Sequence, residues 1–117
     1  MRAVATVLVC LVAAIHVYIL WLEMFAWTKA RGRAAFATTA EFAESTRVLA
    51  ANQGLYNGFL AAGLVWGAVI QRADVQLFFL ACVAVAGVYG ALTVSRRILY
   101  VQTVPAVIAV VFVLLAR

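Results

Sequence analysis

Long apolar stretches separated by short polar connections dominate the pattern of this chain. Four windows of mostly apolar residues follow one another, at residues 4–27, 49–70, 75–94 and 99–116. A helix needs about 20 such residues to cross the hydrocarbon core of a bilayer, and each window is close to that length. The pattern predicts an all-α protein with a single domain, a four-helix transmembrane bundle in which helices joined by short turns are antiparallel neighbours.

The longest connection, between the first two windows, predicts where the helices end and begin. The segment KARGR at residues 29–33 is expected to close the first helix, with Gly32 as its C-terminal breaker. Thr38 is followed three residues later by Glu41, which matches a capping box. The second helix is therefore expected to begin near Thr39, before its apolar part, and an ion pair between Glu44 and the arginine at position 47 would support this start.

Small residues and a proline predict how the helices pack. Gly54, Gly58 and Ala62 recur at four-residue spacing in the second window, so they share one helix face. Such a stripe permits close approach of a neighbouring helix within a membrane. Pro105 lies inside the fourth window and predicts a kink or a local break there, because its ring leaves a backbone carbonyl without its helical donor.

The composition narrows the class of protein. Hydrophobic residues make up 68% of the 117 residues and charged residues only 11%. A soluble domain of this size could not bury so much apolar surface, because small domains bury a limited share of their surface on folding. The net charge of +5 does not indicate nucleic-acid binding, since the basic residues lie at the ends of the apolar windows, where such residues meet headgroups.

The distribution of basic residues predicts the orientation. Six of them follow the first and third windows, whereas three lie at the opposite ends. The positive-inside rule then gives a multi-pass protein of the bacterial cytoplasmic (inner) membrane with both termini outside. Within the six, we expect contacts to lipid headgroups or another anion from Arg31, Arg33, Arg96 and Arg97.

Polar side chains inside the first two windows form the candidate site. They are His16 and Glu23 in the first window and Asn52, Gln53 and Asn57 in the second. Ionisable groups at membrane depth usually face a bundle interior or a water-filled cavity. Glu23 matches Asn52 and Gln53 in depth, and Trp27 lies near the same helix face, so we expect these residues to converge in the cytoplasmic leaflet. The outer half of the bundle is expected to be almost entirely apolar.

The chemistry of these residues leaves several roles open. No GxSxG, P-loop or CxxCH motif is present, and no spacing such as HxxxH supports a metal site, so the cofactor stays unknown. If an arginine reaches Glu23, the carboxylate stays ionised and the pair is structural. If none does, we expect Glu23 to be protonated and ready for proton exchange. Cys10 and Cys82 are isolated and are expected to act as small packing residues.

Three short motifs carry a resemblance to a known family. They are LEMFAW at residues 22–27, RGR at 31–33 and ANQGLYNG at 51–58 with Ala50 before it. The chain resembles the small bacterial integral membrane proteins catalogued as domain of unknown function 1304, over nearly its whole length. The resemblance implies a four-helix membrane protein without an established activity, and the candidate site residues occupy positions that match the family's pattern.

Several functions are consistent with this pattern. We expect an integral membrane protein that binds a small amphipathic or polar-headed ligand in a cytoplasmic-leaflet pocket centred on Glu23 and His16. Whether it is also an enzyme stays open; an enzyme would use the same two residues as a general acid and base. A small homodimeric proton-coupled transporter and a structural or accessory membrane subunit fit the same residues. The expected partners are membrane lipids, with a second copy of the chain if it is a transporter.

Overall fold

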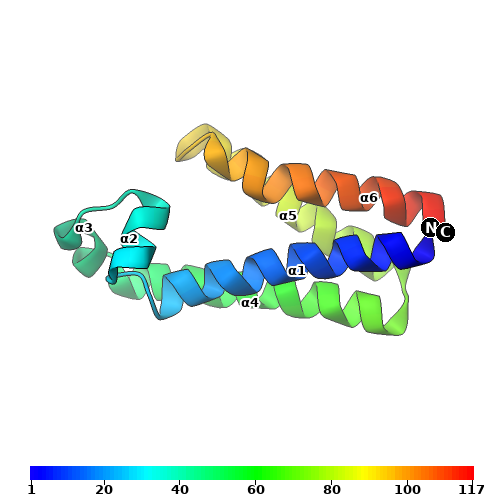
Figure 1. Ribbon diagram of the computed structural model, residues 1–117, viewed down its shortest axis with the longest axis horizontal. Helices are drawn as coiled ribbons and strands as arrows, with labels where there is room; N and C mark the ends of the chain where they lie inside the picture. Colours follow the sequence, from blue (N-terminus) through cyan, green and yellow to red (C-terminus); the bar gives the residue numbers. More distant parts are fainter. The chain divides into compact units, whose positions relative to one another are not determined.

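The structure is a computed structural model that describes residues 1–117 and contains helices but no strands. The helices follow the chain in the order shown in Figure 1: α1 (Arg2–Met24), α2 (Ala30–Phe36), α3 (Ala40–Ser45), α4 (Arg47–Ile70), α5 (Ala73–Thr93), the π-helix η1 (Leu99–Thr103) and α6 (Val104–Ala116). Four segments are long and apolar enough to span a membrane: α1, α4, α5 and the continuous segment Leu99–Ala116. The predicted all-α class with four spans is confirmed.

The chain forms two compact units. We call residues Met1–Ile15 together with Leu60–Arg117 the terminal unit, and residues His16–Phe59 the central unit. The helices α1 and α4 each contribute residues to both units. Of the polar residues predicted to form a site, all those from the first two windows belong to the central unit.

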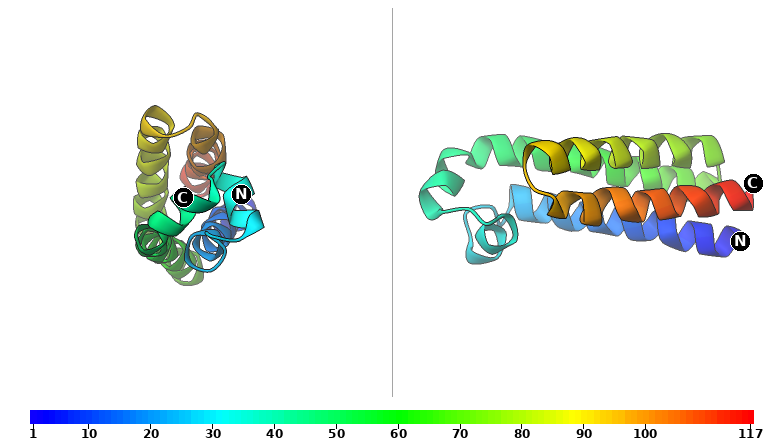
Figure 2. Two further views of the ribbon diagram at one scale, coloured as in Figure 1. Left: turned by 90° about the vertical axis from the view of Figure 1, so that its left-hand side faces the viewer. Right: turned by 90° about the horizontal axis from the view of Figure 1, so that it is seen from above.

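Alanine, valine and leucine side chains build the core of the terminal unit. The core includes Val9 and Val12 of α1, Leu64 of α4, Leu80 of α5 and Ala109 of α6. Close contacts show that successive helices run antiparallel: Gly63 and Gly67 of α4 meet Phe79 and Gln76 of α5, and Gly87 of α5 meets Thr103. Both chain ends and the α4–α5 turn consequently lie at one end of this unit (Figure 2).

The fourth span begins with a wider turn before Pro105. The backbone N–H of Val104 donates to the carbonyl of Leu99, five residues earlier, which closes the π-helix η1. Pro105 follows as the second residue of α6 and has no N–H to donate, so it leaves a backbone carbonyl of the preceding turn without a helical donor. The hydroxyl of Thr103 donates to the carbonyl of Ala84 at 3.1 Å and fixes this turn on α5. The predicted local break is present, just before the proline.

The chain between the first two spans differs from the prediction. Helix α1 ends at Met24, three residues before the predicted end, and Gly32 lies inside α2 rather than terminating α1. Gly32 has a packing role, because a Cβ at this position would collide with the carbonyl oxygen of Ala26. Glycine therefore lets α2 press against the turn that follows α1, and the expectation of a helix breaker was wrong.

The start of the second span also differs. The cap is Thr39 and not Thr38: its hydroxyl oxygen accepts a hydrogen bond from the backbone N–H of Phe42 at 3.1 Å, at the start of α3. The helix then breaks at Thr46, whose hydroxyl donates to the carbonyl of Phe42 at 2.7 Å. Threonine hydroxyls compete with the backbone for helix carbonyls, so α3 and α4 are two helices where one was predicted.

Candidate functional site

A buried carboxyl–amide pair joins α1 to α4 in the central unit. Glu23 is 3% exposed and Asn57 is 8% exposed. The Asn57 Nδ2 donates to Glu23 Oε1 at 2.6 Å, and more weakly to the backbone carbonyl of Gln53 at 3.3 Å. The bond is short, as expected where a carboxyl oxygen accepts in a site removed from water. The buried polar groups of the two helices therefore meet at one point.

Two glycines bring the helices close enough for this bond. A Cβ on Gly54 would lie 2.7 Å from the Met24 Cγ and 3.1 Å from the Glu23 Cβ. A Cβ on Gly58 would lie 2.7 Å from the Leu20 Cδ1. Because no side chain fills either space, α1 and α4 approach closely, and the short side chain of Asn57 between the glycines reaches the carboxyl group.

His16 lies on the same helix as Glu23 and is fully buried. It precedes Glu23 by seven residues, so it lies about 10 Å further along α1 on nearly the same face. The two buried polar side chains of α1 thus lie along one side of the helix. The Glu23 carboxyl is near the C-terminal end of α1, and the His16 imidazole is two turns closer to its N-terminus.

Asn52 and Gln53 do not join the pair. Both are exposed, whereas Ala50, Gly54 and Asn57 are buried. These three define the face of α4 that packs on α1, and the side chains of Asn52 and Gln53 fall outside it. Glu23 was expected to meet Asn52 or Gln53, which match it in depth, or a residue of the third or fourth helix. Its partner in the structure is Asn57, one turn further along α4.

Trp27 lies beyond the end of α1 and contacts residues of the connection between α1 and α4. Its indole Nε1 donates to the Thr46 hydroxyl at 3.0 Å. Its ring packs on Phe36 of α2, with ring centroids 4.9 Å apart. The expectation that Trp27 continues the helix face of His16 was wrong, because the chain turns at residues 25–29. Trp27 instead ties the turn after α1 to the break between α3 and α4.

The basic residues of the central unit have other neighbours than Glu23. Arg31 donates to the Tyr18 hydroxyl at 3.0 Å, and Arg47 forms the predicted ion pair with Glu44 at 3.4 Å on the surface. The Arg33 Nε is buried without a hydrogen-bond partner. Within this unit, Glu23 is therefore paired with an amide and with no arginine.

The predicted basic residues of the terminal unit, Arg96 and Arg97, lie exposed in the turn between α5 and η1. Cys10 and Cys82 are free thiols, the first exposed and the second half-buried. No three His, Cys, Asp or Glu side chains lie together as a group that could hold a metal ion. The predicted site residues that the central unit buries are thus a carboxyl (Glu23), an amide (Asn57) and an imidazole (His16).

One buried polar residue was not predicted from the sequence. Gln76 of α5 is 5% exposed, and its Nε2 donates to the backbone carbonyl of Gly67 at 2.9 Å. It lies in the half of the bundle expected to be almost entirely apolar. The sequence contains a signal for this contact, because Gln76 and Gly67 lie at similar distances from the turn between the second and third windows. That spacing does not show that the two residues face each other; the packing of α4 on α5 does.

Comparison with known proteins gives one family and one curated relative. The family described as proteins of unknown function (DUF1304) matches residues 10–114. The uncharacterised protein YpaA of Lactococcus lactis subsp. lactis (strain IL1403) is 30% identical over 115 residues, which cover 95% of this chain and 97% of the relative. No solved structure matches the chain.

Proposed function

We propose a function from the geometry of the central unit, because the chain belongs to the DUF1304 family, whose function is unknown. In this proposal the chain is an integral membrane protein that binds a small amphipathic ligand through its polar head. Glu23 and Asn57 hold the head group, and His16 lies deeper along α1. The observation that carries the proposal is the buried Glu23 carboxyl, which is joined to an amide donor and to no cation.

The geometry favours a head group that donates hydrogen bonds. The Glu23 Oε1 accepts from Asn57, and no arginine or lysine forms an ion pair with the carboxyl group. A buried carboxyl group without a cationic partner is costly, so an ammonium or hydroxyl head would stabilise it. Such a head would reach Glu23 Oε2, while its apolar tail remains among the apolar side chains of the spans.

A second candidate is the accessory membrane subunit. The contacts of Gly54 and Gly58 with α1 favour it, because the Glu23–Asn57 bond could then serve helix association alone. The two candidates differ in what happens when the carboxyl group is replaced by an isosteric amide.

Glu23→Gln is expected to retain the fold and to weaken binding of an amphipathic amine by about tenfold or more, the loss of one charge-assisted hydrogen bond. The measurement is titration of the purified full chain in uncharged detergent with dodecylamine, with dodecanol as the hydroxyl probe. Glu44→Gln is the matched control, because Glu44 is exposed on α3 and lies outside the pair. Unchanged binding of both probes by Glu23→Gln, together with a lower unfolding temperature, would instead support the accessory subunit.

We further propose that the chain lies in the bacterial inner membrane with both termini outside. The support is the excess of basic residues in the α1–α4 connection and the α5–η1 turn over the opposite ends. Reporter fusions after Arg117 and within the α2–α3 segment are expected to report opposite sides, with the C-terminal fusion active only outside. A C-terminal fusion active in the cytoplasm would reverse the orientation and the leaflet of the site.

A further inference from the structure

We propose that the seam between α1 and α6 in the terminal unit binds one anionic phospholipid. We use the α1/α6 seam for two hollows that share these helices: an apolar groove lined by Leu8, Leu11, Pro105 and Ile108, and a cavity lined by Arg2 and Arg117 and also by residues of the α4–α5 turn and α5. In this proposal the phosphate lies at the end with the two arginines, and one acyl chain lies along the apolar part. The seam lies outside the central unit, so the inference is independent of the function proposed for Glu23.

The head-group end is a small basic cavity. It has a volume of about 130 Å³, and its polar lining comes from Arg2, Thr6, Gln71, Gln76 and Arg117. No Asp or Glu side chain lines it, and neither arginine forms a salt bridge. Guanidinium groups bind phosphate oxygens in a bidentate manner, so two of them at one cavity favour a phosphate group.

The cavity is held in shape by the amide side chains between the helices. The Gln71 Nε2 donates to the Thr6 hydroxyl at 3.2 Å and to the carbonyl of Ala68 at 2.6 Å, which links α1 to the α4–α5 turn. Gln76 is fixed by its bond to Gly67. The guanidinium groups of Arg2 and Arg117 are therefore the hydrogen-bond donors that can bind a ligand in this cavity. The side-chain amides of Gln71 and Gln76 are already bonded and line its sides.

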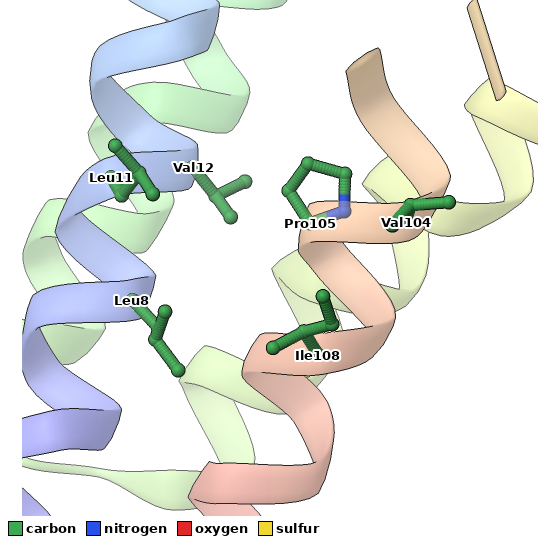
Figure 3. Close-up of a pocket in the computed structure, with 6 residues that line it drawn as sticks. All are labelled: Leu8, Leu11, Val12, Val104, Pro105 and Ile108. Carbon is green, nitrogen blue, oxygen red and sulfur yellow. The ribbon is translucent and has the colours of Figure 1, made fainter. Parts of the chain in front are cut away.

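The apolar end is a groove of about 200 Å³ lined only by carbon-rich side chains from the same two helices. Figure 3 shows Leu8 and Val12 of α1 directed toward Pro105 and Ile108 of α6 across the groove. Leu11 is 52% exposed and Ile108 is 44% exposed, so the groove opens sideways, where acyl chains would surround a spanning helix. A lipid tail can enter it without passing a polar group.

The distance between the basic cavity and the apolar groove matches the thickness of one leaflet of a bilayer. Ten residues of α1 separate Arg2 from Val12, which corresponds to about 15 Å along a helix. That length is half of the roughly 30 Å hydrocarbon core of a bilayer. A phosphate at Arg2 and Arg117 therefore places the acyl chain of the same lipid beside the groove, whereas a free anion would use only the cavity.

The test is native mass spectrometry of the full chain in uncharged detergent with added dioleoylphosphatidylglycerol or dioleoylphosphatidylcholine. We expect the wild type to retain the anionic lipid at least about tenfold better, and the double variant Arg2→Gln/Arg117→Gln to lose that preference. Ile108→Trp fills the groove on an exposed face and is expected to weaken retention of the anionic lipid even where the arginines are intact.

Arg72→Gln is the matched control. It removes one positive charge at the same end of the unit, as each substitution of the double variant does, but Arg72 is bonded to Asp74 at 2.6 Å and does not line the cavity, so retention should not change. Equal retention of both lipids by the wild type, or an equal loss in Arg72→Gln, would overturn the proposal. Displacement of the lipid by millimolar sn-glycerol 3-phosphate, with no effect of Ile108→Trp, would show a free-anion site and overturn it as well.

Discussion

Asn57→Leu is expected to destabilise the chain by about 2–3 kcal/mol, because it leaves the buried Glu23 carboxyl without its amide donor. Leucine has the same number and branching of side-chain heavy atoms as asparagine, so it leaves no cavity and the loss comes mainly from the unpaired carboxyl group. The measurement is reversible unfolding in mixed micelles, followed by helical circular dichroism as the denaturing detergent is increased.

Asn52→Leu is the control for this prediction, since it makes the same change at an exposed position of the same helix. We expect it to alter the free energy of unfolding by less than about 0.5 kcal/mol. The double variant Glu23→Leu/Asn57→Leu should recover part of the loss, because both partners are then apolar. If Asn57→Leu were no more harmful than Asn52→Leu, the carboxyl–amide pair would not be a structural centre of the unit.

Gly54→Leu is expected to separate α1 from α4 and to destabilise the chain by about 3 kcal/mol, at the upper end of overpacking. Even a Cβ at this position would lie 3.3 Å from the backbone carbonyl oxygen of Leu20 and 3.1 Å from the Glu23 Cβ, which cannot move without shifting α1. The same unfolding measurement applies. A lost Glu23–Asn57 contact should also appear as faster hydrogen exchange in the second half of α1.

Ala62→Leu provides the comparison, because Ala62 belongs to the same four-residue stripe but is exposed. We expect it to be nearly neutral, since an added apolar side chain there meets no neighbouring helix. Gly54→Ala should fall between the two, because the Met24 side chain can move aside from a single methyl group. A neutral Gly54→Leu would mean that α1 and α4 do not approach as closely as described.

The number of spans and the burial of Glu23 could be predicted from the sequence. Apolar length predicts membrane helices directly, and a carboxyl group inside such a helix predicts a buried site. The partner of Glu23 was harder to predict, because depth along a helix depends on where the helix ends. The face of α4 that packs on α1, which is set by Gly54, selects Asn57 over Asn52 and Gln53.

The connection between the first two spans could not be derived from local signals. Glycine often terminates a helix, but Gly32 instead allows α2 to lie against the backbone carbonyl of Ala26, which is a tertiary interaction. Two consecutive threonines could each cap a helix, and the choice of Thr39 depends on which N–H its hydroxyl meets. The burial of Gln76 could not be predicted for the same reason, since its partner is a backbone carbonyl of another helix.

The wide turn of η1 changes how the last span can be interpreted. Each residue of an α-helix advances by about 100°, so the one additional residue of a π turn rotates everything after it by about that angle relative to everything before it. Ile98, which meets Gly90, and Ala106, which is buried in the core, therefore belong to two helical phases. A single helical wheel drawn over residues 99–116 would assign some of its positions to the wrong face. The π turn therefore lies at the start of the fourth span: the residues before it follow one helical phase, and the 13 residues of α6 follow another, with their own inward side.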